Sequence, residues 1–409
     1  MNATSDRPIV RSPSVERGAS PLLRALLAIL ARLQCGSLQV EMPDGRVYRA
    51  AGPEPGPEGR IAVASPKFLR RLFREGHLGF GEMFVDGWWT TPDLQSLLDV
   101  IMLNNDGVGL SFPGAGLFRL WERLRRRLKA NTRTGSRRNI AYHYDLGNDF
   151  YALWLDETMT YSSALFRSPK ERLADAQRNK YAAICDRIAQ APGGRVLEIG
   201  CGWGGFAEYA IRERGLRVTG LTLSREQRDY ARKRLFQAGL ADRADIVLRD
   251  YREERGAYDA VASIEMIEAV GEKYWPVFFS TLRERLRPGG VAALQAITIS
   301  DWLFPQYRNS TDFIQRYIFP GGLLPSPEKL RDCASGAGLQ TIGVDSYANS
   351  YTRTLNAWRR RFNARWNRIA ELGFDDRFHR MWNFYLAASA AGFVSGTTDV
   401  VQIAYRKQE

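Results

Sequence analysis

The sequence predicts an α/β fold whose centre is a parallel, doubly wound sheet. One observation is the stretch 195–205, in which a short apolar run breaks into four glycines within six residues, followed by an amphipathic helix pattern. The other is the alternation of strand and helix patterns from there to the end of the chain. Elements that alternate in this way form a parallel sheet with ligands at the carboxyl ends of its strands. Glycines suit that turn because the backbone bends tightly and then lies against a ligand at a helix N-terminus.

Seven strands are expected in the C-terminal part of the chain. They cover 195–199, 217–222, 244–250, 258–263, 291–299, 339–345 and 399–405. Helices are expected at 224–239, 274–286, 327–336, 351–372 and 376–392. The loops that follow the strands, at 200–205, 222–227, 250–251 and 264–268, would then build the ligand pocket.

The N-terminal part predicts a small α+β domain over residues 21–118, after a tail, 1–20, that has no periodicity and that we expect to be disordered. A helix is expected at 21–33. It is too short to span a bilayer, and we place it in the core, with a membrane-surface helix as the alternative. The other expected elements are two or three strands within 35–65, helices at 65–73 and 93–103, and a glycine- and aromatic-rich turn at 78–89.

The formal net charge is +13, and the most basic stretch, 119–138, holds nine Lys or Arg against the single acid Glu122. We expect a linker there that contacts an anionic phospholipid surface, where each cation contributes about 1 kcal/mol. A solvated linker is the alternative. Nucleic acid is disfavoured as a partner because the sequence has no zinc spacing and no nucleic-acid-binding signature. Four cysteines are scattered without metal or disulfide spacing, so we expect a reduced, cytoplasmic protein without a structural metal.

The glycine turn has the spacing Gly200-x-Gly202-x-Gly204, with Glu198 two residues before it. This form is typical of methyltransferases that bind S-adenosylmethionine, whose amino-acid part needs a shallow cradle, and it differs from the G-x-G-x-x-G of dinucleotide folds. The prediction from the residues is therefore an S-adenosylmethionine site.

Seven motifs in order make a more specific resemblance. They lie at 142–151, 159–162, 197–206, 220–227, 264–271, 319–326 and 351–358 and include Leu197-Glu-Ile-Gly-Cys-Gly-Trp-Gly-Gly-Phe206 and Ile264-Glu-Met-Ile-Glu-Ala-Val-Gly271. With these motifs the chain resembles the cyclopropane fatty acid synthase and mycolic acid methyltransferase family. The resemblance implies a class I S-adenosylmethionine-dependent methyltransferase, with a Rossmann-like seven-stranded sheet and helical lid insertions, as a catalytic domain over 139–409. The length resembles the two-domain bacterial synthases.

The cofactor site implied by the pattern and the resemblance draws on every loop at the carboxyl edge. Its expected residues are Tyr161, Ser162, Glu198, Gly200, Gly202, Gly204, Thr222, Leu223, Gln227, Asp250, Tyr251, Ile264 and Glu265. The second strand ends without the acid that usually binds ribose, so Gln227 is the natural substitute, with an ordinary surface glutamine as the alternative. Asp250 and Tyr251 would flank the adenine.

Moving a methyl group from a sulfonium to an alkene leaves a carbocation, so the site should be dry and rich in aromatic faces and should hold a base for one proton. Candidates for the substrate lining are Tyr144, Trp302, Phe313 and Tyr317, with Tyr161 and Tyr274 as further aromatic residues. The resemblance implies that the base is a bound bicarbonate, held by Ser163, Glu268, Gln295, the backbone of Ile297, and Tyr351.

This sequence departs from the family pattern at the anion site. Ser163 replaces a cysteine, Gln295 replaces a histidine, and Ala269 replaces the histidine that usually follows the glutamate. Serine and glutamine still form hydrogen bonds, but the charge around the anion changes. The resemblance therefore supports methyl transfer more directly than it supports ring closure.

The resulting hypothesis is an enzyme that methylates the cis double bond of an unsaturated phospholipid acyl chain and closes a cyclopropane ring. Methylation without ring closure, giving a methyl or methylene branch, is one alternative. A non-catalytic lipid-binding homologue and a methyltransferase for small molecules are the others. The expected partner is a phospholipid membrane surface, to which the protein attaches peripherally from the cytoplasm. The oligomeric state is not predicted, and a homodimer is one alternative.

Overall fold

The computed structural model describes residues 19–104 and 146–408. The basic stretch 119–138 and nearly all of the tail 1–20 lie outside the described residues. The chain divides into two compact units. The first contains the described N-terminal residues together with Ser310–Phe313 and Phe374–Ser395, and the second contains the rest. The domain limits 21–118 and 139–409 stay predictions, but the helix within 374–395 clusters with the N-terminal elements.

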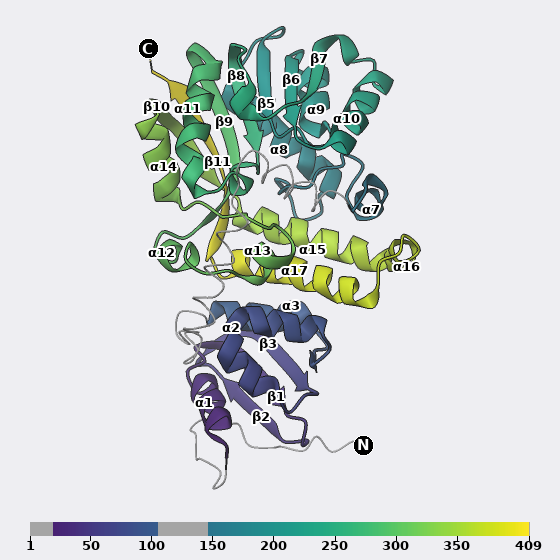
Figure 1. Ribbon diagram of the computed structural model, residues 1–409, viewed down its shortest axis with the longest axis vertical. Helices are drawn as coiled ribbons and strands as arrows, with labels where there is room; N and C mark the ends of the chain where they lie inside the picture. Colours follow the sequence, from purple (N-terminus) through teal and green to yellow (C-terminus); the bar gives the residue numbers. More distant parts are fainter. Residues whose placement is uncertain (1–18, 105–145, 409) are drawn as a thin grey trace. The chain divides into compact units, whose positions relative to one another are not determined.

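The first unit is built on a four-stranded sheet of order β2-β1-β3-β4 (Figure 1). Its strands are β1 (Cys35–Glu41), β2 (Val47–Ala51), β3 (Glu54–Val63) and β4 (Trp89–Thr90). Its helices are α1 (Pro21–Leu30), α2 (Phe68–Val85), α3 (Leu94–Leu103) and α17 (Asp376–Val394). The guanidinium of Arg380 in α17 donates to the carbonyls of Phe84 and Trp89, which ties this late helix to the early elements.

The predicted turn at 78–89 is wrong over most of its length, because α2 continues as a helix to Val85. A kink at Gly76, whose φ is +60°, separates the two halves of α2. Gly81 is small for a packing reason: a Cβ there would lie 2.6 Å from the Phe313 ring and 2.8 Å from the Phe384 ring. Trp89 is fully buried.

The second unit is an α/β domain with a seven-stranded sheet of order β10-β11-β9-β8-β5-β6-β7 (Figure 1). Its strands are β5 (Arg195–Ile199), β6 (Arg217–Thr222), β7 (Ala244–Leu248), β8 (Tyr258–Ile264), β9 (Leu286–Ile299), β10 (Leu339–Ser346) and β11 (Thr398–Lys407). The predicted seven-stranded fold is confirmed, and β5 lies at the point where the order of the strands reverses. That position is where ligands bind in open α/β sheets.

The expectation of a wholly parallel sheet is corrected at one strand. β11 runs antiparallel to both β9 and β10, whereas the other neighbouring strands pair in parallel. After β10 the chain makes its helical excursion at the carboxyl edge of the sheet. It re-enters the sheet from that same edge, so β11 must run in the opposite direction.

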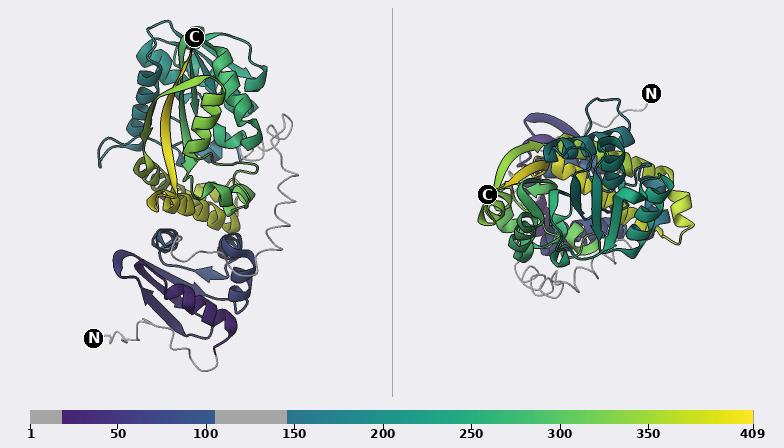
Figure 2. Two further views of the ribbon diagram at one scale, coloured as in Figure 1. Left: turned by 90° about the vertical axis from the view of Figure 1, so that its left-hand side faces the viewer. Right: turned by 90° about the horizontal axis from the view of Figure 1, so that it is seen from above.

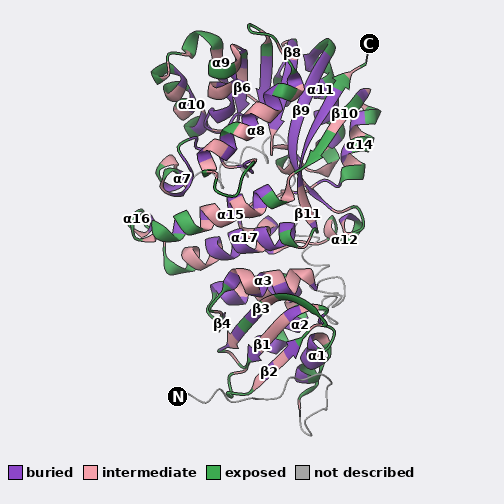
Figure 3. Cartoon of the chain, turned by 180° about the vertical axis from the view of Figure 1, so that it is seen from behind, coloured by how far each residue is buried: buried purple, intermediate pink, exposed green. Residues whose placement is uncertain are grey.

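Helices cover both faces of this sheet, as the side view shows (Figure 2). Side chains of α11 (Trp275–Arg285) and α14 (Pro327–Gly336) pack in one core cluster, which includes Leu197 and Leu221. Side chains of α8 (Leu173–Ile188), α9 (Gly205–Arg214) and α10 (Arg225–Gln237) pack in the other, with Val196 and Val218. Neighbouring residues of one strand thus enter opposite cores, as the pleat requires. The central strands are consequently the most buried elements in Figure 3.

The remaining helices are short or form the excursion after β10. They are α7 (Asn148–Trp154), α12 (Phe304–Tyr307), α13 (Phe313–Tyr317), α15 (Ala348–Ala364), α16 (Trp366–Ala370) and the 3₁₀ turns η1 (Ala241–Arg243), η2 (Tyr251–Glu253), η3 (Ile267–Ala269) and η4 (Glu272–Tyr274). The single helix predicted at 351–372 is two helices that meet at Arg365. No helix in the described ranges is long and apolar enough to cross a membrane.

Candidate active site

The glycine turn after β5 has the backbone that its sequence predicts. Gly200, Gly202 and Gly204 all have positive φ, at 85°, 52° and 81°. A Cβ on Gly200 would lie 2.9 Å from the Met266 side chain, and one on Gly204 would lie 3.0 Å from Ala231, so these two glycines allow close packing. A Cβ on Gly202 would meet nothing within 4 Å. Gly202 therefore borders open space, which is what a ligand cradle requires.

Glu198 is a buried carboxylate at the end of β5. Its side-chain atom Oε2 has no hydrogen-bond partner among the described residues, and burial raises its pKa to about 8, against the opposing charge of Lys180. A buried carboxylate without a partner is costly unless a cation or donor reaches it. S-Adenosylmethionine carries an ammonium and a sulfonium, so both the open space at Gly202 and the unpaired Glu198 oxygen fit this cofactor.

The turn after β6 holds Gln227 in a defined orientation. Ser224 caps α10 and accepts from the backbone N–H of Gln227, while the Thr222 hydroxyl donates to Gln227 Oε1 at 2.8 Å. The amide oxygen is thereby used within the protein. Any ligand hydroxyl at this residue would meet the amide nitrogen as a donor. Leu223, between them, is half-buried in the same turn.

After β7, the Asp250 carboxylate is 1 % exposed and receives two side-chain hydrogen bonds from the Arg252 guanidinium, at 2.8 and 2.5 Å. Burial raises the pKa of the Tyr251 hydroxyl, whose ring lies edge-on to Phe278 at 5.5 Å. These residues therefore occupy the expected loop, with the Asp250 carboxylate already ion-paired.

A second group of residues meets around the carboxylate of Glu265, at the end of β8. Its Oε1 accepts from the backbone N–H of Ser163 at 2.7 Å and from Gln295 Nε2 at 2.8 Å, and its Oε2 accepts from the Tyr351 hydroxyl at 2.7 Å. The donors come from three segments far apart in the sequence. The expected role of Glu265 beside the cofactor, in the loop with Ile264, stays a prediction; in the structure its carboxylate accepts from these three donors.

Glu268 lies one turn further on, in η3. Its Oε1 accepts from the backbone N–H of Ile297 at 2.5 Å, while its Oε2 is buried without a partner in the described part of the chain. Burial, and then the nearby charge of Glu265, raise the pKa of Glu268 to about 8. Ser163, Glu268, Gln295, Ile297 and Tyr351 are thus brought together as the sequence analysis expected.

The predicted bicarbonate does not fit these residues as they are arranged. A bound anion would need the donors on Ser163, Gln295 and Tyr351, and all three already donate to the Glu265 carboxylate. A second anion at this point would also face Glu265 itself, and like charges in a buried site repel strongly. We therefore derive no step through bicarbonate.

Lys180 is a site residue that the sequence analysis missed. It is fully buried in α8, and its ammonium donates to Ser162 Oγ at 2.6 Å. Desolvation lowers its pKa to about 7, although the nearby charges of Glu265, Asp156 and Glu198 raise it. Its position was readable in principle: on α8, Lys180 falls on the same helical face as Ile184 and Ile188, where a cation is unusual.

An aromatic cluster adjoins the Glu265 group. The Tyr351 ring lies 6.2 Å from Trp358, Trp358 lies 5.2 Å from Tyr161, and Tyr161 lies 5.4 Å from Trp154 and 6.2 Å from Phe319. Such π-faces stabilise a nearby cation. Tyr161 and Tyr351 were expected at the site, whereas Trp154, Phe319 and Trp358 were not.

The four residues predicted to line the substrate site differ in location and exposure. Tyr144 lies outside the described residues. Trp302 is 59 % exposed, which disagrees with a dry lining, because its loop places the ring towards solvent. Phe313 is buried against Phe384, 4.7 Å away in the first unit. Tyr317 is half-buried, with the Arg316 guanidinium 5.6 Å from its ring.

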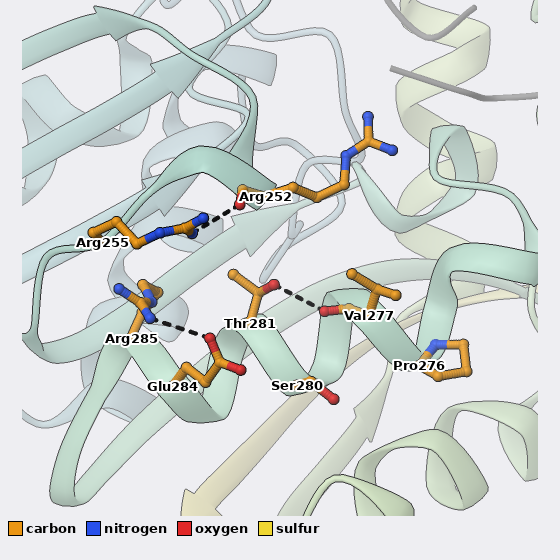
Figure 4. Close-up of a pocket in the computed structure, with 8 residues that line it drawn as sticks. All are labelled: Arg252, Arg255, Pro276, Val277, Ser280, Thr281, Glu284 and Arg285. Carbon is orange, nitrogen blue, oxygen red and sulfur yellow. Dashed lines mark hydrogen bonds and ion pairs between the residues drawn. The ribbon is translucent and has the colours of Figure 1, made fainter.

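A separate pocket of about 460 Å³ lies beside α11, lined by side chains that include Arg252, Arg255 and Arg285 (Figure 4). Its cations are already used: Arg252 pairs with Asp250, and Arg255 and Arg285 donate to backbone carbonyls. This pocket contains none of the residues that surround the Glu265 carboxylate. Among the described residues, no cluster of ligating side chains could hold a metal ion.

Comparisons with known proteins identify the family of the chain. Residues 131–403 match the family model for mycolic acid cyclopropane synthetase. A tuberculostearic acid methyltransferase of Mycobacterium tuberculosis is 41 % identical over 406 residues, covering 95 % of this chain and 92 % of the relative. A cyclopropane-fatty-acyl-phospholipid synthase of Escherichia coli is 33 % identical over 388 residues, covering 90 % and 96 %.

A solved structure shares the catalytic fold. The mycolic acid cyclopropane synthase CmaA1, crystallised with S-adenosylhomocysteine (SAH) and CTAB, superposes with a TM-score of 0.62 at 30 % identity, covering 66 % of this chain and 98 % of that one. The chain therefore belongs to the mycolic acid cyclopropane synthetase family of S-adenosylmethionine-dependent methyltransferases.

Proposed function

We propose that this chain transfers the methyl group of S-adenosylmethionine to one carbon of the double bond in an unsaturated lipid acyl chain. The observation that supports this most directly concerns Tyr351: its hydroxyl donates to the half-buried carboxylate of Glu265, and its ring borders the aromatic cluster. Transfer of a methyl group to an alkene leaves a carbocation, which is stabilised by π-faces around it and needs a base beside it to take a proton. Few other methyl acceptors would need both.

The cofactor supplies an electrophilic methyl group on a sulfonium. In this proposal Gly202 leaves room for its amino-acid part, Glu198 pairs with its ammonium, and Gln227 donates to a ribose hydroxyl. Tyr161 adds an aromatic face, and the 250–251 loop borders the adenine of the cofactor. The first three assignments follow from the open space at Gly202, the unpaired Glu198 oxygen and the orientation of the Gln227 amide.

The product depends on how the carbocation formed by methyl transfer is resolved. Proton loss from the new methyl group closes a cyclopropane ring. If a hydride first moves from the methylated carbon to its cationic neighbour, the same proton loss gives a methylene branch. A saturated methyl branch would further need a reductant. We put the acyclic product first, because the tuberculostearic acid methyltransferase is more similar to this chain than the cyclopropane synthase is.

Ring closure is the second candidate, supported by the near full-length similarity to the Escherichia coli synthase. The preferred lipid is proposed to be a phospholipid at a membrane surface, reached from the cytoplasm with help from the basic stretch. Both products are one CH₂ heavier than the substrate, so mass alone does not separate them.

The test is to incubate the purified chain with S-adenosylmethionine and vesicles of unsaturated phospholipid, and then to analyse the acyl chains by mass spectrometry and proton NMR. Gain of one CH₂ is expected. Olefinic =CH₂ signals would identify the methylene product, and ring CH₂ signals the cyclopropane. No gain of mass with any unsaturated phospholipid or free fatty acid would overturn the proposed function.

A further inference from the structure

Glu265 stands in an unusual backbone conformation for a glutamate. Its φ is +49°, one of three positive values at non-glycine positions in the described chain, and its N–H donates to the carbonyl of Gln295 at 2.8 Å. A left-handed residue with a side chain costs roughly 1–2 kcal/mol relative to glycine. Strain of this kind persists where the surrounding structure requires a particular side chain at that point.

The side chain at this strained position is a half-buried carboxylate with three donors. The Ser163 N–H, the Gln295 amide and the Tyr351 hydroxyl all point at it, and they come from a loop, β9 and α15. Hydrogen bonds of this kind favour the charged form. Burial nevertheless raises the pKa of Glu265 above its usual value, and the nearby Lys180 ammonium and the three hydrogen bonds oppose that rise. The arrangement therefore resembles an anion-binding site whose anion is part of the chain.

Gln295 is itself held in place for this task. Its Nε2 also donates to the Ser163 carbonyl at 3.1 Å, and its Oε1 accepts from Gln402 Nε2 at 3.0 Å on the neighbouring strand β11. The amide orientation is therefore fixed, with its nitrogen towards Glu265. A rigid donor of this kind is a feature of preorganised sites.

We propose that the Glu265 carboxylate occupies the anion position of this site and accepts the proton that leaves after methyl transfer, so that turnover needs no bicarbonate. The proposal rests on the proposed function. Its grounds are the three convergent donors, the strained backbone that presents the carboxylate, and the adjoining aromatic cluster.

Atoms and electrons balance in this reaction. The electron pair of the double bond forms the new C–CH₃ bond while the C–S bond of the sulfonium breaks, which leaves a carbocation on the neighbouring carbon. A C–H bond of the transferred methyl group then breaks, and its electron pair forms either the third ring bond or, after a hydride shift, a C=CH₂ bond. The proton goes to Glu265 and then to solvent. The same base thus serves either product.

Two substitutions at this one position separate the proposal from its alternatives. Glu265→Gly removes the carboxylate, relieves the positive φ and leaves the three donors around an empty space. Glu265→Gln fills the space with a neutral group of the same shape that cannot take a proton. Both are measured for SAH affinity by calorimetry and for turnover with S-adenosylmethionine and phospholipid vesicles, in buffer freed of bicarbonate and then with bicarbonate or formate added.

The wild-type chain should turn over equally with and without bicarbonate and should not bind it in calorimetry. Both variants should lose about 10²–10⁴-fold in turnover, the range of a general base, while SAH affinity stays near the parental value. Added bicarbonate or formate should bind to Glu265→Gly and restore much of its turnover, but should not restore Glu265→Gln.

The proposal is overturned if the wild-type rate falls when bicarbonate is removed, if Glu265→Gln keeps more than about a tenth of the parental turnover, or if the anions fail to rescue a folded Glu265→Gly. Should Glu265→Gly not fold, the isosteric Glu265→Gln and the wild-type bicarbonate dependence decide the matter. Failure of the proposed function itself would look different, since the wild-type chain would then methylate no unsaturated lipid at all.

Discussion

The cradle at Gly202 gives the sharpest test of the cofactor site, because the chain holds a matched control. Gly202 and Gly239 both have positive φ, 52° and 69°, and an added Cβ would meet nothing within 4 Å at either. Gly239 ends α10 at its C-terminus, whereas Gln227 lies in the first turn of that helix. The 13 residues of α10 put about 20 Å between its two ends. Gly239 therefore lies well away from the proposed cofactor pocket.

Valine at either glycine must adopt a left-handed conformation, which costs roughly 1–2 kcal/mol of folding free energy. Gly202→Val and Gly239→Val should therefore lose similar stability in urea unfolding. Only Gly202→Val puts two methyl groups into the proposed ligand space, so it alone should weaken S-adenosylmethionine binding, by at least about tenfold or 1.4 kcal/mol. Calorimetry with both folded variants measures this difference. If the two bind the cofactor with equal affinity, the open space at Gly202 is not the cradle.

The charged residues lead to three further predictions. The pKa of Glu268 is raised to about 8, so between about pH 5 and 8 its carboxyl is protonated in the folded state and ionised in the unfolded state. The free energy of unfolding should therefore fall as the pH rises through this range, by up to about 1.4 kcal/mol per pH unit from this group. Urea unfolding of Glu268→Gln should show a smaller fall, because the contribution of Glu268 is gone while Glu198, whose pKa is also raised to about 8, still titrates. The turnover loss of this variant should be smaller than that of Glu265→Gln, because both Gln and the protonated acid are neutral; an equal pH dependence in the two proteins would contradict the burial argument. The pKa of Lys180 is lowered from 10.5 to about 7, so the wild type loses stability as the pH falls from about 10.5 to about 7, and Lys180→Met should become more stable relative to the wild type over that range. Its pH–rate profile should also move to higher pH, because Glu265 loses a nearby positive charge, and an unmoved profile would mean that Lys180 does not act on the base. Replacing the four cations at 125–127 and 129 with Gln should weaken binding to anionic vesicles in sedimentation assays without changing cofactor affinity, and equal vesicle binding would leave only a solvated linker.

Much of the catalytic fold was readable because its signals are local. The β-branched runs placed β6 and β8 to within a residue, and the glycine spacing located the turn after β5. Features set by tertiary packing were not readable. The glycines at 78–89 suggested a turn, yet Gly81 lies in a helix, where the lack of a side chain lets the Phe313 and Phe384 rings pack against its backbone. The direction of β11 likewise depends on the edge at which the helical excursion returns.

The same limit applies to the site. Each loop at the carboxyl edge was predicted, since the position of a strand end follows from the pattern of that strand. The partners of Glu265 were not, because Ser163 and Tyr351 lie 102 and 86 residues away from it in the sequence. Position alone suggested that Glu265 binds the cofactor. Only the assembled fold shows three donors converging on its carboxylate.

A carboxylate that belongs to the chain changes the electrostatics of the reaction as well as its proton transfer. Glu265 and Lys180 lie close enough to affect each other's charge, so together they add little net charge to the resting site. Methyl transfer moves a positive charge from the sulfonium to the acyl chain, and the carboxylate is already fixed by its three hydrogen bonds. A fixed charge needs no reorganisation when the cation forms, which is the main advantage of a preorganised site. A freely exchanging anion would have to bind before each turnover, whereas Glu265 is held in place by the strained backbone turn that follows β8.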